Sequence, residues 1–309
     1  MKDKKRKKGK KNIVTAIIAF VILIFAFIMN ETGQLDKLLY TVDNDNNEGT
    51  FSENETILNA YFLDVGQGDC SLFISGTQSM LIDCGEKENA DAVIQTISDY
   101  GIDNIDYIVA THAHSDHIGA MSDIIDAFTV SNIIISEPSE DSASTSTYEN
   151  FVDSVNNSNA NVILATTGYS FSFGKANCTI LAPFQVDNAN ENNNSVVMLI
   201  EAGETSFLMT GDAEKTVEKE LMLNYPNIDV DILKVGHHGS STSSSTDFIE
   251  AISPKTAIIQ CGLNNRYGHP TEKTIKTLDN ENIKYYRTDI NGGITVHCSE
   301  SSYSIEVEK

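Results

Sequence analysis

Short apolar runs alternate with amphipathic stretches along residues 57–309. The runs are bounded by Gly, Asn or Pro and predict strands, whereas apolar residues that recur at helical spacing predict helices. The expected strands are 59–65, 72–75, 80–83, 107–111, 132–136, 162–165, 178–181, 196–201, 206–210, 231–235, 256–260, 284–287, 294–297 and 303–307. The expected helices are 90–100, 119–128, 147–155, 213–223, 245–252 and 272–279, and the polar stretch 139–147 is expected to be a surface loop. This alternation predicts β-sheets whose outer faces are covered by helices.

One uninterrupted apolar run precedes this pattern. Residues 13–29 carry no charge, and eight Lys and Arg side chains stand immediately before them. A membrane-spanning helix needs about 20 apolar residues, and its basic flank stays in the cytoplasm. A cleaved signal peptide is the alternative, but no small-x-small cleavage site follows the run. We therefore expect a basic cytoplasmic segment at 1–12, a transmembrane anchor at 13–29, a flexible linker at 30–56 and an outward-facing domain at 57–309.

The charge of the chain is divided unevenly. The whole chain has 21 basic and 44 acidic residues, and removing the eight basic and one acidic residue of positions 1–11 leaves 13 and 43. Nucleic-acid binders normally show a basic surface, so such an acidic body makes tight nonspecific binding of duplex DNA unexpected. The five cysteines are scattered and form no CxxC, which indicates small buried apolar side chains rather than a disulfide framework.

The densest group of polar side chains follows the apolar segment 105–110. Residues 112–117 read His-Ala-His-Ser-Asp-His and hold three of the seven histidines. Neutral imidazole nitrogens and carboxylate oxygens are ligands of divalent metals. A histidine-rich surface loop is the alternative, but clusters of His and Asp usually mark metal sites. The spacing therefore predicts ligands for two neighbouring metal ions.

Three further strand ends carry the same kinds of side chain. Asp83 and Asp212 each follow an apolar run, and the pair His237 and His238 follows the run 231–235. An Asp after a strand often caps a turn, and a single His is more often structural than ligating. Repeated at three strand ends, these residues together favour a metal site at the carboxyl ends of the strands.

These motifs resemble those of the metallo-β-lactamase-fold hydrolases, and more narrowly the hydrolase domain of the ComEC/Rec2 competence proteins and their stand-alone relatives. The matching segments follow the family order within residues 57–309. They are Phe-Leu-Asp-Val-Gly-Gln-Gly-Asp at 62–69 and the segments 81–85, 111–119, 193–197, 210–212, 233–240, 266–270 and 286–289. The resemblance implies an α/β fold of the αββα sandwich type, with metal ions at one edge between its two sheets.

The resemblance also implies roles for individual residues. The implied ligands are His112 and His114 for the first ion, Asp116, His117 and one of His237 and His238 for the second, and Asp212 as a bridge. The choice between the two adjacent histidines stays open. Asp83 is implied to support the ligand loop, because carboxylates commonly orient metal-bound histidines. Two zinc ions are the expected cofactor, and manganese is the alternative.

The first metal site departs from the broad superfamily, which supplies it with a third histidine ahead of the bridging Asp. No histidine occurs between His117 and His237, and Asn194 and Ser195 fill the corresponding stretch. An amide or hydroxyl oxygen is a weaker ligand than imidazole. We therefore expect the first ion to be labile or to complete its ligand set with water.

The ligand set predicts a hydrolytic mechanism. Two neighbouring metal ions lower the pKa of a bridging water and neutralise an anionic transition state, so the expected nucleophile is a metal-bound hydroxide. The expected catalytic side chains are Asp116, His269 and His238, with His269 the first candidate to protonate the leaving group. The expected substrate contacts are Asn194, Ser195, Lys234, Ser240 and Arg266.

Taken together, these features predict a membrane-anchored hydrolase of a phosphate ester, in the first place a phosphodiester. The candidate substrates are extracellular DNA, a small nucleotide and a cell-wall phosphodiester, and the candidate partners are the DNA-uptake or cell-wall machinery. Two alternatives remain open: a hydrolase of β-lactams or lactones, and a metal-binding or sensor module with little catalysis.

Overall fold

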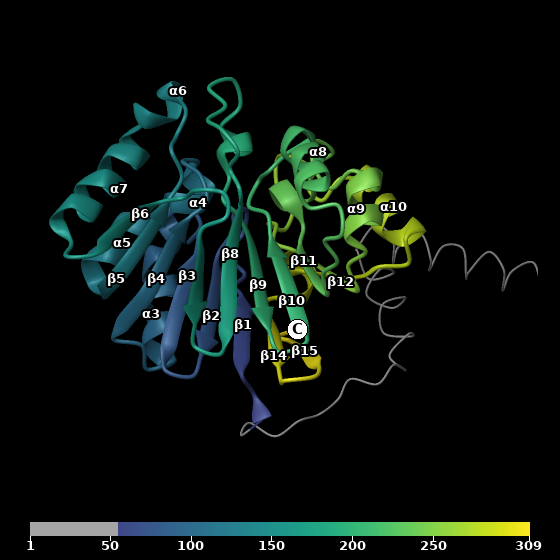
Figure 1. Ribbon diagram of the computed structural model, residues 1–309. Helices are drawn as coiled ribbons and strands as arrows, with labels where there is room; N and C mark the ends of the chain where they lie inside the picture. Colours follow the sequence, from purple (N-terminus) through teal and green to yellow (C-terminus); the bar gives the residue numbers. More distant parts are fainter. Residues whose placement is uncertain (1–54) are drawn as a thin grey trace, which may run out of the picture. The chain divides into compact units, whose positions relative to one another are not determined.

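Two β-sheets form the centre of the computed structural model, which describes residues 55–309 (Figure 1). The first sheet has the strand order β15-β14-β1-β2-β3-β4-β5-β6 and the second the order β13-β12-β11-β10-β9-β8-β7. The strands are β1 (Leu58–Phe62), β2 (Ser71–Ser75), β3 (Gln78–Ile82), β4 (Asn104–Ala110), β5 (Thr129–Ile135), β6 (Asn161–Leu164), β7 (Ser170–Phe173), β8 (Ala176–Ala182), β9 (Val197–Ala202), β10 (Thr205–Met209), β11 (Ile232–Lys234), β12 (Thr256–Ile259), β13 (Lys284–Arg287), β14 (Ile294–Cys298) and β15 (Tyr303–Val307).

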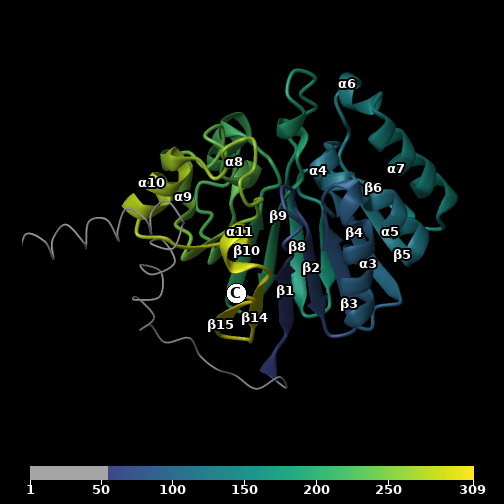
Figure 2. The ribbon, with the colours of Figure 1, turned by 180° about the vertical axis from the view of Figure 1, so that it is seen from behind.

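Each sheet combines antiparallel and parallel pairing. In the first sheet β3, β4, β5 and β6 run parallel, and in the second β10, β11, β12 and β13 do so. Strand β14 lies beside β1 and β15 lies beside β14, as the view from behind shows (Figure 2). Because parallel strands end at the same sheet edge, the loops that follow β3 and β4 lie together, as do those that follow β10, β11 and β12.

Aromatic side chains fill the space between the two sheets. The ring of Phe73 on β2 meets the ring of Phe207 on β10 edge to face, with 5.6 Å between centroids. Tyr107 on β4 stacks on Phe171 of β7 at 4.4 Å. Period-two alternation explains this packing, since every second residue of a strand points to the same face.

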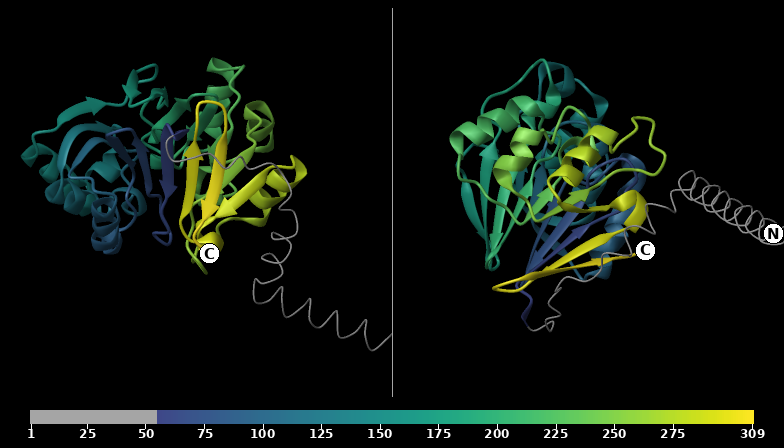
Figure 3. Two further views of the ribbon diagram at one scale, coloured as in Figure 1. Left: turned by 90° about the horizontal axis from the view of Figure 1, so that it is seen from below. Right: turned by 90° about the vertical axis from the view of Figure 1, so that its right-hand side faces the viewer.

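Helices cover the outer faces of both sheets. They are α3 (Ala90–Asp99), α4 (Ser115–Ile118), α5 (Met121–Ala127), α6 (Glu140–Ala143), α7 (Ser146–Asn157), α8 (Lys215–Asn224), α9 (Thr246–Ile252), α10 (Glu272–Asn280) and α11 (Thr288–Asn291). Helices α3, α5 and α7 share a core with the first sheet, and α8, α9 and α10 share one with the second. These two groups of helices lie on opposite sides of the strands (Figures 1 and 3). The predicted αββα sandwich is therefore confirmed.

One prediction of local structure is wrong, and one strand was not predicted. Residues 139–147 are not one loop, because α6 and the start of α7 lie there. Ser139 accepts a hydrogen bond from the Ser142 amide and Thr145 accepts one from the Tyr148 amide, so each begins a helix as its N-cap. Strand β7 was not predicted, although Ser and Phe alternate along it.

The cysteines lie within the described residues, whereas the N-terminal segments lie almost entirely outside them. All five cysteines are buried and free, as predicted. The basic segment, the anchor at 13–29 and nearly all of the linker lie outside the described residues. Among residues 55–309, no helix has the length and apolar character needed to cross a membrane.

Candidate metal centre

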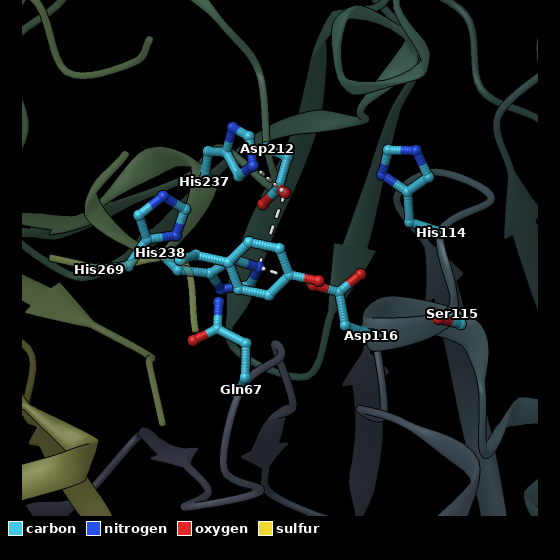
Figure 4. Close-up of a pocket in the computed structure, with 9 residues that line it drawn as sticks. Gln67, His114, Ser115, Asp116, Asp212, His237, His238 and His269 are labelled. Carbon is cyan, nitrogen blue, oxygen red and sulfur yellow. Dashed lines mark ion pairs between the residues drawn. The ribbon is translucent and has the colours of Figure 1, made fainter. Parts of the chain in front are cut away.

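The strand ends that carry the predicted ligands meet at one edge of the sandwich. Residues 112–117 follow β4, and Asp83 follows its parallel neighbour β3. In the second sheet, Asp212 follows β10, and His237 and His238 follow the parallel strand β11. Figure 4 shows the side chains of Asp116, Asp212 and the two adjacent histidines turned toward one another across this edge.

One group of side chains has the geometry of a closed metal site. His117 Nε2 lies 3.3 Å from Asp212 Oδ1, and His238 Nε2 lies 3.2 Å from Asp116 Oδ2 and 3.6 Å from Asp212 Oδ2. Ligands that bind one zinc ion tetrahedrally at about 2.0–2.1 Å are about 3.3 Å apart. His117, Asp212 and His238 can therefore bind one ion, with Asp116 beside His238 Nε2 as a fourth ligand. Asp69 also offers an oxygen within 4.8 Å of ligand-type atoms of His117, Asp212 and His238. We call the group of Asp116, His117, Asp212 and His238 the second site.

A smaller group lies next to it. His112 Nε2 is 3.0 Å from His114 Nδ1 and 4.0 Å from Asp212 Oδ2. Ligand-type atoms of these three residues lie within 4.8 Å of one another. Asp212 thus belongs to both groups and can bridge two ions. This group, the first site, offers three side chains where the second site offers four.

Unpaired buried atoms test whether a cation fits here. His117 Nε2, His238 Nε2 and Asp212 Oδ1 are buried and have no hydrogen-bond partner. Buried polar atoms without a partner are rare because each costs desolvation free energy. All three atoms face the second site, so a bound divalent cation would satisfy them together. The donor set fits a metal ion.

The pKa directions agree with this conclusion. Burial, with His117 nearby, holds the pKa of His112 well below its usual range, which leaves a neutral imidazole able to bind metal. Burial opposes the charged form of His117, yet Asp212 and Asp83 raise its pKa well above the usual range. Burial likewise opposes the charged form of His238, yet Asp212 and Asp69 raise its pKa to about 10. The carboxylates thus attract positive charge, which a metal ion would supply.

Polar residues behind the ligands hold them in place. Asp83 Oδ2 lies 2.7 Å from His117 Nδ1, and the same carboxylate accepts hydrogen bonds from the amide and hydroxyl of Thr111. Buried Glu191 accepts a hydrogen bond from the Ala113 amide at 2.9 Å and so supports the loop of residues 112–117 from the opposite sheet. Glu191 was not predicted, because no periodicity or motif marks it.

The two adjacent histidines take different places. His238 is buried and belongs to the second site, whereas the side chain of His237 is 23% exposed and lies outside both groups. His237 Nδ1 is 3.4 Å from Glu214 Oε1. Both residues have positive φ, a turn that separates neighbouring side chains and that the sequence does not reveal.

The five expected substrate contacts lie away from the cavity between the ligands. Ser195 Oγ is 3.3 Å from His112 Nδ1, the ring nitrogen that faces away from the metal group. Asn194 Oδ1 accepts a hydrogen bond from the Asp187 amide, within its own loop. Lys234 and Ser240 are buried as well. Arg266 is exposed and donates to the Tyr267 hydroxyl at 2.6 Å. Contact of these residues with a substrate stays a prediction.

A cavity of about 270 Å³ opens above both sites. It is lined by Gln67, His114, Ser115, Asp116, Asp212, His237, His238, Tyr267 and His269. Gln67 and Tyr267 were not among the predicted site residues, although both stand in motifs that resemble the family. Burial, together with the two adjacent histidines, lowers the pKa of His269 to about 4. His269 is therefore neutral at neutral pH, with its buried Nδ1 unpaired.

This fold and this cluster of His and Asp at the strand ends define a metallo-β-lactamase-fold protein. The sequence description of the metallo-beta-lactamase superfamily matches residues 63–156. Among solved structures, the metallo-beta-lactamase fold protein YhfI from Bacillus subtilis is similar over 81% of this chain and 100% of that chain, with a TM-score of 0.52 and 13% identity. That likeness shows the fold alone.

Curated relatives narrow the class. ComE operon protein 3 of Bacillus subtilis is 35% identical over 256 residues, which cover 75% of this chain and 32% of the relative. Competence protein ComA of Neisseria gonorrhoeae is 29% identical over 78% of this chain and 32% of its own length. These comparisons support a ComEC/Rec2-like protein of the metallo-β-lactamase fold, and the chain spans about a third of the length of these relatives.

Proposed function

We propose that this protein is a metal-dependent phosphodiesterase that holds two ions, zinc in the first place and manganese as the alternative. The observation that carries the proposal is the cavity itself, which joins both ligand groups to two histidines outside them, His237 and His269. A metal-binding or sensor module needs the ligands alone. Hydrolysis of an ester also uses side chains beside the ions that transfer a proton or donate a hydrogen bond to the developing charge.

The chain's own residues have separable tasks in this reaction. Bound ions would supply charge neutralisation and a nucleophilic water at neutral pH. His269, being neutral, would donate an N–H to a phosphoryl oxygen rather than deliver a proton. His237 lines the same cavity, and Glu214 lies against its Nδ1 and orients the ring. The His269 ring lines the cavity, and its Nδ1 is buried with no hydrogen-bond partner.

The substrate and the location are further parts of the proposal. The competence relative favours DNA or a nucleotide, whereas the 43 acidic residues outside positions 1–11 disfavour a long duplex. The sequence of residues 1–29 supports a single-pass anchor with the domain outside the cell. A partner in DNA uptake or in the cell wall fits that location, and a cell-wall phosphodiester is the competing substrate.

A substrate panel on the purified full-length chain tests the proposal. We expect zinc- or manganese-dependent hydrolysis of bis-p-nitrophenyl phosphate and of single-stranded DNA, cyclic dinucleotides or phosphocholine esters. Asp116→Asn should remove this activity, and the exposed Asp126→Asn should retain it. Hydrolysis of β-lactams alone would replace the phosphodiesterase assignment. An inert metal-loaded protein would leave the sensor module as the better description.

A further inference from the structure

A buried ion pair lies next to the second site. Its carboxylate, Asp69, lies within 4.8 Å of ligand-type atoms of His117, Asp212 and His238, but it faces His238 on the side of Nδ1. Asp69 is 4% exposed and Lys234 is 1% exposed, and Lys234 Nζ lies 2.6 Å from Asp69 Oδ2. Burying two charges costs more desolvation free energy than their attraction commonly returns. Such a pair therefore needs an explanation beyond stability.

The backbone fixes Asp69 against the loop that carries the ligands. The Asp69 amide donates to the Asp116 carbonyl at 3.1 Å, and its own carbonyl accepts from the Gly85 amide at 2.8 Å. Gly68 makes the first contact sterically feasible, because a Cβ there would lie 2.4 Å from the Asp116 oxygen. Asp69 thus keeps a set position relative to Asp116 and the strand end after β3.

The second oxygen of Asp69 faces a metal ligand. Asp69 Oδ1 lies 3.1 Å from His238 Nδ1, and it is buried without a hydrogen bond. The same ring nitrogen lies 3.0 Å from the Gln260 carbonyl oxygen. Across the ring, His238 Nε2 faces Asp116 and Asp212. Asp69 therefore touches the side of the imidazole that does not bind metal.

Lys234 comes from the opposite sheet and balances this carboxylate. It ends β11, four residues before His238, and its Nζ also donates to the Val235 carbonyl at 2.9 Å. Without Lys234, Asp69 would add a third negative charge beside Asp116 and Asp212. With it, the pair places a carboxylate oxygen 3.1 Å from His238 Nδ1 and adds no net charge.

We propose that Asp69 and Lys234 act together as a positioning unit for the second metal site. Asp69 holds the His238 ring with Nε2 toward the ion, and Lys234 neutralises Asp69 and ties it to the strand that leads to His238. This inference rests on the metal site of the proposed function, not on its substrate. Carboxylates that orient a metal-bound histidine typically change metal affinity about 10- to 100-fold when removed.

A second ion pair provides the matched comparison. Asp231 and Lys255 also meet at 2.6 Å, with a buried carboxylate. Asp231 precedes β11, whereas Lys234 is the last residue of that strand and leads to His238. The other oxygen of Asp231 accepts from the Ser206 amide and hydroxyl, away from the metal ligands. Loss of this pair should lower stability without changing metal binding.

The experiment is competition for zinc between a chelator and the full-length protein, with no substrate present. In Asp69→Asn we expect one of two bound equivalents to weaken about 10- to 100-fold and the other to stay within about threefold. In Asp231→Asn we expect both equivalents to keep their affinity while the unfolding temperature falls. Unchanged binding in Asp69→Asn, or equal weakening in both variants, would overturn the positioning role.

A double variant covers the case in which Asp69→Asn does not fold. Asp69→Asn with Lys234→Met removes both charges, so neither is left buried alone. It should fold and show the same selective weakening, and wild-type affinity at both sites would contradict the inference. A wild-type chain that binds no metal would contradict the proposed function itself. A wild-type chain that binds two ions, with an unaffected double variant, would contradict the positioning role alone.

Discussion

The two metal sites share Asp212 but differ in their number of ligands and in the groups that lie behind their histidines. The second site has four ligands, and acidic side chains lie behind its histidines: Asp83 at 2.7 Å from His117 and Asp69 at 3.1 Å from His238. The first site has three, and hydroxyls of Thr111 and Ser195 stand behind His112 at 3.1 and 3.3 Å. The hydrogen bond between His117 and Asp83 involves a charged group, and such bonds are roughly twice as strong as neutral ones. Asp69 contacts His238 without a hydrogen bond. The difference indicates a tightly held second ion and a labile first ion.

The largest effect should come from the residue that both sites share. In Asp212→Ala we expect neither ion to survive dialysis and phosphodiesterase activity to fall at least about 1000-fold, since both the nucleophile and charge neutralisation depend on the ions. Metal content by mass spectrometry and turnover of bis-p-nitrophenyl phosphate measure this. One ion retained at wild-type affinity would show that Asp212 does not bridge.

The adjacent histidines separate ligation from contact with substrate. His238→Ala should lower zinc affinity of one equivalent at least about 100-fold, because it removes one of four ligands of the second site. His237→Ala should keep both equivalents and lose activity instead. Chelator competition and steady-state kinetics on the same preparations distinguish the two effects. The reverse pattern would assign His237 as the ligand.

The groups behind the histidines give a smaller effect and a direct comparison of the sites. Asp83→Asn should weaken the second ion about 10- to 100-fold, whereas Ser195→Ala should weaken the first ion by less than about tenfold, because Thr111 remains as a second hydroxyl near His112. Zinc titration of each variant measures this. Equal losses at both sites would show that the charge of the supporting group does not matter.

The smallest effect concerns pH and the metal-free protein. The pKa of His238 is raised to about 10 in the folded chain, above its unfolded value of about 6.5. The resulting stabilisation is complete below about pH 6.5 and is lost as the pH rises through about 10. Chelated wild-type protein should therefore unfold several degrees above chelated His238→Gln at pH 6, and the gap should close near pH 10. A gap that widens with pH would contradict this sign.

Most of the fold could be predicted from the sequence because buried side chains recur at short, regular spacing along strands and helices. Alternation along β1, where Leu58, Ala60 and Phe62 are buried, identifies a strand without tertiary knowledge. Strand β7 was not predicted because it is short and half exposed. Helix α6 was not predicted because it is one turn long and polar, and only its N-cap indicates a helix.

The site was predictable where ligands follow apolar strands and not where loops supply them. Asp83, Asp212 and the cluster at 112–117 all follow predicted strands and meet at one sheet edge. Asp69 stands in a glycine-rich turn, and its position depends on contacts with Asp116 and Lys234 from distant parts of the chain. Lys234 was expected to face substrate, and its burial against Asp69 follows from tertiary packing that a strand pattern does not encode.

The claim that the second site binds its ion more tightly than the first is tested most directly by locating the first ion that binds. Chelated protein given one equivalent of zinc can be crystallised and the ion placed by anomalous scattering. We predict that it lies among Asp116, His117, Asp212 and His238, while the group of His112 and His114 fills only with further zinc. An ion found first between His112 and His114, or divided equally between both sites, would contradict the account.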